Sequence, residues 1–256
     1  MILAILQARV SSTRLHGKVL KPLLGEPMLF REIERIRRAS SIDQLLVATS
    51  NDASDDPIAV LCRDNGTLCY RGNLEDVLDR YYFTAKEFGP EHVVRLTGDC
   101  PLIDPEVIDR VIRFYLNGAF DYASNTVAPT FPDGLDVEVF RFSCLETAWR
   151  EARLPSQREH VTPFIHQQQD RFRVGCLRNE RDLSHMRWTV DEAEDFEFVT
   201  QVYEALYWDK PGFEMKDVLR LLERKPELMG INAQFQRNEG YLKSLVEDAS
   251  TDANET

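Results

Sequence analysis

Apolar and polar residues follow two patterns along the chain, and each pattern predicts a different kind of element. The first pattern is a short apolar run, and the earliest four runs are apolar almost throughout, as is typical of strands buried on both faces of a sheet. These runs predict strands at residues 1–6, 45–49, 67–70, 93–96, 122–124, 137–140, 172–176 and 187–190.

The second pattern has apolar residues on one side of a longer segment and charges on the other, which is typical of helices. Asn73 and Asp104 are suited to be N-caps, and Gly118 to follow a helix end. Ser143-x-x-Glu146 matches a capping box at a further helix start. The pattern predicts helices at residues 27–39, 74–88, 105–117, 192–208 and 215–224, and one that opens at Ser143.

The alternation of strands and helices predicts an α/β fold with a mainly parallel central sheet. We expect a single domain over residues 1–246, followed by a polar, acidic and disordered tail over residues 247–256. Ligands of such sheets bind outside the carboxyl ends of the strands. The loops at those ends are therefore where we expect a functional site.

The composition excludes several classes of partner. A formal charge of −12 on 256 residues repels nucleic acid. The five cysteines are odd in number and form no CxxC pair, which argues against a disulfide framework or a structural zinc site. No apolar run is long enough to span a membrane and no signal-peptide pattern opens the chain, so we expect a soluble, cytoplasmic protein.

A cluster of cations and hydroxyls stands out against this acidic background. Arg9, Arg14 and Lys18 follow the first predicted strand together with two serines and a threonine. Such a loop can cradle phosphate oxygens with guanidinium, ammonium and backbone N–H groups. It matches neither a Walker A loop nor the G-x-G-x-x-G fingerprint. From the residues alone, a phosphate-binding loop and an exposed loop with solvated cations remain equally good interpretations.

Two aspartates at predicted strand ends are candidates for a metal site. Asp99 follows the strand at residues 93–96 and is expected at the same sheet edge as the basic loop. A divalent cation would relieve its repulsion of a phosphate, because Mg²⁺ is commonly held by one or two carboxylates and substrate phosphates. A plain turn residue is the alternative for Asp99. For Asp191, spacing alone favours an N-cap of the next helix.

Seven blocks together resemble a known family. They are QARVSSTRLHGKVL, LVATSNDASDDPIA, YRGNLEDVLDRYY, VVRLTGDCPLIDP, FPDGLDVEVF, REHVTPFI and MRWTVDEAEDF, in this order over residues 7–196. The chain closely resembles the spore-coat polysaccharide biosynthesis protein F family, which is related to the acylneuraminate and Kdo cytidylyltransferases. The resemblance implies a nucleotide-diphospho-sugar transferase (GT-A-like, Rossmann-like) fold. It also implies transfer of CMP from CTP to an acidic sugar-like acceptor, with Mg²⁺ and release of pyrophosphate, in glycan precursor biosynthesis.

The resemblance also implies roles for individual residues. It assigns the triphosphate to Arg9, Ser12, Arg14 and Lys18, the base or ribose to Gln7 and Ala8, and further nucleotide contacts to Arg71, Gly72, Asp76 and Asp99. It assigns catalysis to Arg14, Lys18 and Asp99, the metal to Asp99 and Asp191, and the acceptor to Asp136, Glu138, Arg158, Glu159 and His160. A homodimer through residues 120–142 or 172–190 is expected as well, since related enzymes form dimers through an inserted region.

The basic loop departs from the usual family pattern, QARMGSTRLPGKVL, at three positions. Val10 and Ser11 replace Met-Gly, and His16 replaces Pro. Ser11 lacks the freedom of glycine at positive φ, so a different loop shape is expected. Two alternatives to CMP transfer stay open: a transferase of the same fold that uses another nucleoside triphosphate, and a nucleotide-binding protein without catalysis.

Overall fold

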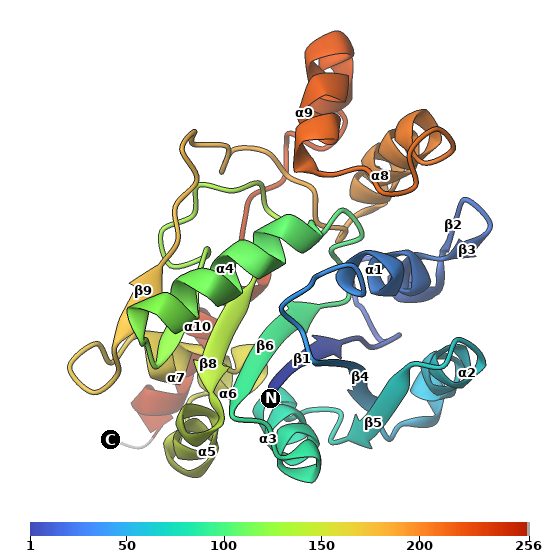
Figure 1. Ribbon diagram of the computed structural model, residues 1–256. Helices are drawn as coiled ribbons and strands as arrows, with labels where there is room; N and C mark the ends of the chain where they lie inside the picture. Colours follow the sequence, from blue (N-terminus) through green and yellow to red (C-terminus); the bar gives the residue numbers. More distant parts are fainter. Residues whose placement is uncertain (255–256) are drawn as a thin grey trace.

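The computed structural model describes residues 1–254, and side chains as far as residue 249. Its central sheet has the strand order β5-β4-β1-β6-β8-β7-β9 (Figure 1). The strands are β1 (Ile2–Gln7), β4 (Gln44–Ser50), β5 (Leu68–Gly72), β6 (His92–Thr97), β7 (Tyr122–Ser124), β8 (Glu138–Arg141) and β9 (Val174–Cys176). Only β8 runs antiparallel to its neighbours, so the predicted α/β fold with a mainly parallel sheet is confirmed.

Helices cover both faces of this sheet (Figure 1). They are α1 (Met28–Ile36), α2 (Asp56–Asp64), α3 (Val77–Phe88), α4 (Pro105–Gly118), α5 (Phe142–Glu151), α6 (Pro155–His160), α7 (Pro163–His166), α8 (Ala193–Leu206), α9 (Met215–Arg224) and α10 (Glu239–Asn254). Three short 3₁₀ turns, η1 (Lys18–Leu20), η2 (Ala53–Asp55) and η3 (Pro226–Gly230), and a hairpin, β2 (Pro22–Leu23) with β3 (Glu26–Pro27), complete the described elements.

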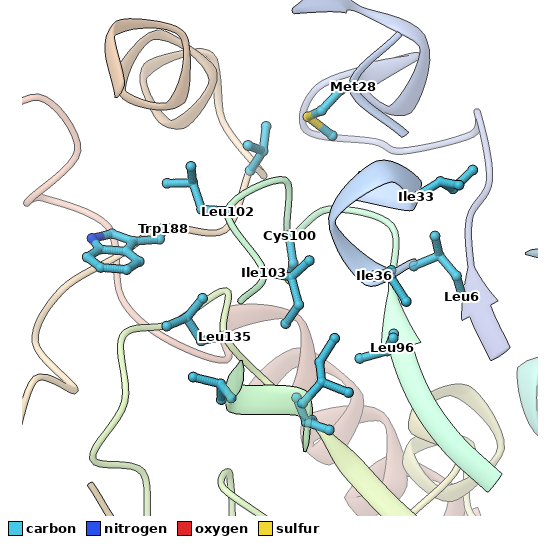
Figure 2. Close-up of a cluster of buried hydrophobic side chains, with 14 of the residues drawn as sticks. Leu6, Met28, Ile33, Ile36, Leu96, Cys100, Leu102, Ile103, Leu135 and Trp188 are labelled. Carbon is cyan, nitrogen blue, oxygen red and sulfur yellow. The ribbon is translucent and has the colours of Figure 1, made fainter. Parts of the chain in front are cut away.

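The side chains of β1 alternate between two apolar cores. Ala4 and Leu6 face the larger core, which contains α1, α4 and residues of α8 and α9. Leu3 and Ile5 face the smaller core, which α3 and α5 cover. Figure 2 shows the part of the larger core where α1 residues meet the turn after β6 and the side chain of Trp188. This packing fixes the carboxyl ends of β1 and β6 side by side, because burial on both faces leaves the strands no alternative register.

Several predicted boundaries differ from the structure. Residues 187–190 form no strand and share only one β-bridge, between Asp133 and Arg187, because this segment runs over the loop containing Gly134. The N-cap of α3 is Asp76 rather than Asn73. Helix α5 starts directly after β8, which leaves Ser143 inside its first turn without a capping bond.

Other predictions agree more closely. Asp104 caps α4 by accepting hydrogen bonds from the N–H groups of Glu106 and Val107. Gly118 is the last residue of that helix, and Ala119 takes the left-handed conformation in its place. Helix α9 has the predicted bounds, whereas α2, α6 and α7 have no counterpart among the predicted helices.

The C-terminal segment differs from the expected disordered tail. Helix α10 begins at Glu239 and continues to Asn254, so residues 247–254 are helical, while residues 255–256 lie outside the described part. Asp248 explains part of this order, because its carboxylate accepts a hydrogen bond from Ser156 N at the start of α6. Within the described residues, no helix combines the length and hydropathy that a membrane crossing requires.

Candidate active site

The basic loop leaves the end of β1 and is anchored by a buried carboxylate. Asp55 accepts a hydrogen bond from Val10 N at 2.7 Å through one oxygen and from Ser50 through the other. Val10 O in turn accepts from the N–H of Gly17, which takes the left-handed conformation at φ 68°. Ser11 is not among the residues with positive φ. The loop therefore needs no glycine at position 11.

Lys18 projects from this loop into the centre of the site. Its ammonium donates to Asp99 Oδ2 at 3.1 Å, to Asp191 Oδ1 at 2.8 Å and to Val190 O at 2.7 Å. Burial alone would lower the pKa of Lys18, but the two carboxylates outweigh it and hold the pKa above its usual value. The buried lysine is therefore charged and bridges the turn after β6 and the segment before α8.

Arg14 lies beside Lys18 and contacts acidic groups from two different elements. Its guanidinium is 2.8 Å from Asp191 Oδ1 and 3.4 Å from Glu239 Oε2, the first residue of α10. A third carboxylate, that of Glu192, lies 3.7 Å away. The predicted cationic residues of the loop thus face a set of carboxylates in this structure.

Asp99 and Asp191 have the donor chemistry that Mg²⁺ prefers. Both direct a carboxylate oxygen at the same ammonium nitrogen, and Val190 N donates to Asp99 O, which keeps the two segments together. Burial would raise the pKa of Asp99, but Lys18 and hydrogen bonds lower it overall. In the described residues no group of three or more His, Cys, Asp and Glu side chains could hold a metal. These two carboxylates therefore fit a cation whose remaining ligands come from a substrate.

Asp191 is not the N-cap that its spacing suggests. Glu192 caps α8, and Asp195 accepts hydrogen bonds from the N–H groups of Asp191 and Glu192. Arg187 holds this turn in place, because its guanidinium contacts Asp195, Asp191 and Asp133. The Asp191 side chain is thereby free of the helix start and points at Lys18 and Arg14.

Two clefts meet at this cluster. The first, of about 370 Å³, contains most of the residues assigned to the nucleotide. The second, of about 440 Å³, shares Arg14, Asp99 and Asp191 with the first. The predicted residues that line the first cleft are Gln7, Ala8, Arg9, Ser12, Arg14, Lys18, Asp99, Asp191, Glu159 and His160. The predicted residues that line the second cleft are Arg14, Asp99, Asp136, Glu138, His160 and Asp191.

Four predicted residues lie outside both clefts. Arg71 contacts Asp56 and the carbonyl groups of Ser50 and Asp52, where it joins β5 to the turn before α2. Gly72 ends β5, and an added Cβ would lie 3.1 Å from Arg80 Cγ. Asp76 caps α3 and binds Arg158, which also donates to Trp149 O. The contacts of these residues are structural in this conformation.

The acceptor-side carboxylates are paired with arginines that sequence reasoning missed. Glu138 is bound by Arg95 and accepts from Tyr122 and Thr162, and although burial would raise its pKa, these partners lower it. Asp136 is bound by Arg237, yet burial keeps its pKa above the usual value. Arg95 stands in β6 between apolar residues, which is the only sequence signal that could have marked it.

A buried carboxylate that was not among the predicted site residues lies close to Asp99. Glu32 of α1 is fully buried and accepts from Cys100 N at 3.3 Å, while its Oε1 has no hydrogen-bond partner in the described structure. Burial and the nearby Asp99 raise its pKa well above the usual value. The raised pKa favours the neutral acid, which would add no further negative charge near Asp99.

Comparison with known proteins decides the family. A family model described as "Cytidylyltransferase" matches residues 3–229. The chain belongs to this cytidylyltransferase family. The resemblance found in the sequence is thereby confirmed, and the protein is a nucleotidyltransferase enzyme.

Relatives of similar length support the family assignment. An uncharacterized protein of Methanocaldococcus jannaschii is 34% identical over 92% of this chain and 96% of its own. The spore coat polysaccharide biosynthesis protein SpsF of Bacillus subtilis is 34% identical over 88% of this chain and 95% of its own. A solved cytidylyltransferase from Leptospira borgpetersenii is 31% identical, with a TM-score of 0.86 over 92% of this chain and 99% of its own.

A more distant structure shares the fold alone. It is the CMP:2-keto-3-deoxy-manno-octonic acid synthetase complexed with CTP, which is 15% identical. The TM-score is 0.61 over 80% of this chain and 98% of that chain. The nucleotidyltransferase fold expected from the sequence is confirmed by these neighbours.

Proposed function

We propose that this enzyme transfers CMP from CTP to a hydroxyl or acidic group of a sugar-like acceptor, with release of pyrophosphate. The observation that carries the proposal is the position of Lys18, Asp99 and Asp191 where the two clefts meet. A triphosphate in the first cleft and an acceptor in the second would bring the α-phosphorus and the attacking oxygen together at this junction. The names of the relatives supply CTP and polysaccharide synthesis as the substrate context.

The reaction forms one bond and breaks another at the α-phosphorus. The acceptor oxygen attacks in line, and the bond from the α-phosphorus to the bridging oxygen of the β-phosphate breaks to release pyrophosphate. A hydroxyl acceptor loses its proton to solvent, whereas an acidic group attacks already ionised. Catalysis of this kind depends on positioning and on neutralising charge. Arg14 and Lys18 are placed to stabilise the negative charge that develops on the leaving group, while Arg9 and Ser12 line the same cleft.

Asp99 and Asp191 would hold Mg²⁺ together with substrate oxygens. When bound, the cation would neutralise phosphate charge and lower the pKa of an acceptor hydroxyl. Lys18 now occupies the space between these carboxylates, so its ammonium would shift toward the phosphates as substrate enters. The residues assigned to the acceptor that reach the second cleft, Asp136, Glu138 and His160, would orient the acceptor.

Assembly and compartment complete the proposal. We infer a homodimer that uses residues 120–142 or 172–190, because the enzymes that the sequence resembles form dimers through an inserted region. Light scattering at two concentrations would measure the mass of the particle in solution. All five cysteines are free thiols, which suits the reducing cytoplasm.

Pyrophosphate release with a panel of acceptors tests the proposed activity. CTP, UTP, ATP and GTP are each incubated with sugar acids, amino sugars and phosphorylated or phosphonate compounds, with and without Mg²⁺. We expect release with CTP and Mg²⁺ and one acceptor class. Release with another triphosphate alone would assign a different nucleotide, and nucleotide binding without release from any acceptor would assign a non-catalytic role.

A further inference from the structure

The C-terminal helix α10 lies outside the matched family region, yet it forms part of both clefts. The family model ends at residue 229, whereas α10 begins at Glu239. Gly240 lines both clefts. Tyr241 lines the second cleft, called the acceptor cleft below, and Lys243 lines the first cleft, called the nucleotide cleft. Figure 1 shows α10 near α6 and α7. A segment beyond the end of the family-model match therefore supplies a wall of the site.

Polar contacts on one side of α10 hold it against α6 and α7. Ser244 donates to Glu159 at 2.7 Å and lies 3.1 Å from His160 Nε2. Tyr241 accepts from Gln167 and packs its ring edge-to-face on His160. Together with the bond from Ser156 to Asp248 described above, these contacts hold the helix in place without using Glu239 or Lys243.

Two side chains of α10 with opposite charge line the clefts, Glu239 the second cleft and Lys243 the first. Glu239 lies 3.4 Å from Arg14 and is about one-third exposed, with a side-chain exposure of 31%. Lys243 stands four residues later, one helical turn along the same face, and is exposed at the nucleotide cleft. Glu239 thus forms an ion pair with the Arg14 guanidinium, which the proposed function assigns to the triphosphate. Lys243 adds a cation to the nucleotide cleft.

We propose that α10 is part of the nucleotide-binding site, with Lys243 as a further phosphate-binding residue and Glu239 as an internal occupant of Arg14 that CTP displaces. This inference rests on the proposed function, because it takes the ligand of the first cleft to be CTP. Phosphate oxygens carry more charge than one carboxylate, so Arg14 exchanges Glu239 for the triphosphate. The helix stays in place through its contacts to α6 and α7.

Two substitutions on α10 are expected to change CTP affinity in opposite directions. Glu239→Gln removes the competing charge but keeps an amide oxygen that can accept from Gln236 N, as Glu239 does now. It should lower the dissociation constant of CTP, and Lys243→Ala should raise it. Each change should be about two- to fivefold, as for exposed ion pairs.

Isothermal titration calorimetry with CTP and Mg²⁺, without acceptor, measures these constants directly. Glu223→Gln and Lys225→Ala are matched controls, because both residues are exposed at the end of α9 and line neither cleft. Opposite shifts in the two α10 variants, with unchanged controls, support the proposal. A detached or disordered helix would shift both variants the same way, and that result or the absence of any shift would overturn it.

The same titration separates this inference from the proposed function. Wild-type protein that binds CTP while both α10 variants bind it unchanged would overturn only the role of α10. Wild-type protein that binds no CTP would overturn the proposed function and the role of α10 together.

Discussion

The ammonium group of Lys18 lies between the carboxylates of Asp99 and Asp191, with a side-chain exposure of only 9%. Burying such charges costs desolvation free energy, so the ion pairs add little net stability to the fold. Removing one partner is costly, however, because it leaves the other charge buried and unpaired. In this structure Lys18 neutralises the charge of both carboxylates.

Lys18→Ala and Asp99→Asn should each lower turnover by a factor on the order of 10²–10³, the typical cost of one lost transition-state interaction. The measurement is pyrophosphate release at saturating CTP and acceptor, with circular dichroism to confirm that both variants are folded. Lys225→Ala, on the surface at the end of α9, is the control and should keep wild-type turnover. Near-normal turnover in both site variants would rule out this site assignment.

Lys18→Met should also reveal the metal site without any assay of activity. Without the ammonium, two carboxylates face one another, and the free energy of unfolding should fall by an amount near the lower end of about 3–5 kcal/mol. Mg²⁺ should then raise the melting temperature more in Lys18→Met than in wild type, because it replaces the lost charge. Differential scanning calorimetry with and without Mg²⁺ measures this, and an equal Mg²⁺ effect in both proteins would contradict it.

Sequence reasoning at the residue scale found the groups that stand at strand ends but not those that support them. Lys18 and Asp99 could be placed because parallel strands bring their carboxyl ends to one edge, whereas Asp191, which follows no strand, was assigned to the metal only through the family resemblance. Asp55 holds the basic loop across 45 residues of sequence, and Arg187, which contacts Asp191 four residues away, is also bound to Asp133 across 54 residues. Side-chain contacts over such separations leave no local pattern.

Residues 133–135 pack against residues 186–190, and this contact helps to position Asp191 in the site. Trp188 N donates to Asp133 O and Asp133 N donates to Met186 O, so the two segments run together just before Asp191. Gly134 makes the close approach possible with φ 101°, and a Cβ there would lie 2.5 Å from Thr189 N. An L side chain at this position is excluded both by its φ and by the space.

Gly134→Ala should therefore destabilise the protein by about 3 kcal/mol or more, through backbone strain and overpacking. Gly66→Ala is the matched control, because Gly66 also has positive φ but nothing within 4 Å of an added Cβ. The control should lose only about 1 kcal/mol. Urea denaturation gives both free energies of unfolding, and equal losses would show that crowding at Gly134 is unimportant.

Element prediction succeeded where burial alone determines the pattern. The strands β1, β4 and β6 are apolar because helices cover both faces, and α9 has one apolar stripe with a clear end. The six-residue α6 and the four-residue α7 are too short to show a helical period. Helix α10 is polar overall and is ordered through hydrogen bonds to α6 and α7, which its composition does not reveal.

At the scale of the whole molecule, some buried carboxyl groups have a lowered pKa and others a raised pKa. Arg95 and hydrogen bonds keep the pKa of Glu138 below its usual value despite burial. Burial, and then the neighbouring Asp136, raise the pKa of Asp133 to about 7. A lowered pKa gives stability that is lost as the pH falls, whereas a raised pKa gives stability that is lost as the pH rises through the folded value.

These opposite contributions predict that the free energy of unfolding is greatest on the acidic side of neutrality. Below about pH 5 the unfolded chain takes up protons before Glu138 does, which destabilises the fold. From about pH 4, where Asp133 ionises in the unfolded chain, to about pH 7, where it ionises in the folded protein, its raised pKa removes stability as the pH rises, and the net charge of −12 adds self-repulsion. Urea denaturation from pH 4 to pH 8 should show a maximum near pH 5–6, and greatest stability at pH 8 would contradict this reasoning.

Two variants separate the contributions of Glu138 and Asp133 to this profile. Glu138→Gln leaves the buried Arg95 without its carboxylate and should cost about 3–5 kcal/mol near neutral pH, with the deficit shrinking below pH 4 where wild-type Glu138 protonates. Asp133→Asn cannot ionise, so its decline in stability between pH 5 and pH 8 should be shallower than in wild type. Parallel profiles for both variants would mean that overall charge, rather than these two buried groups, sets the pH dependence.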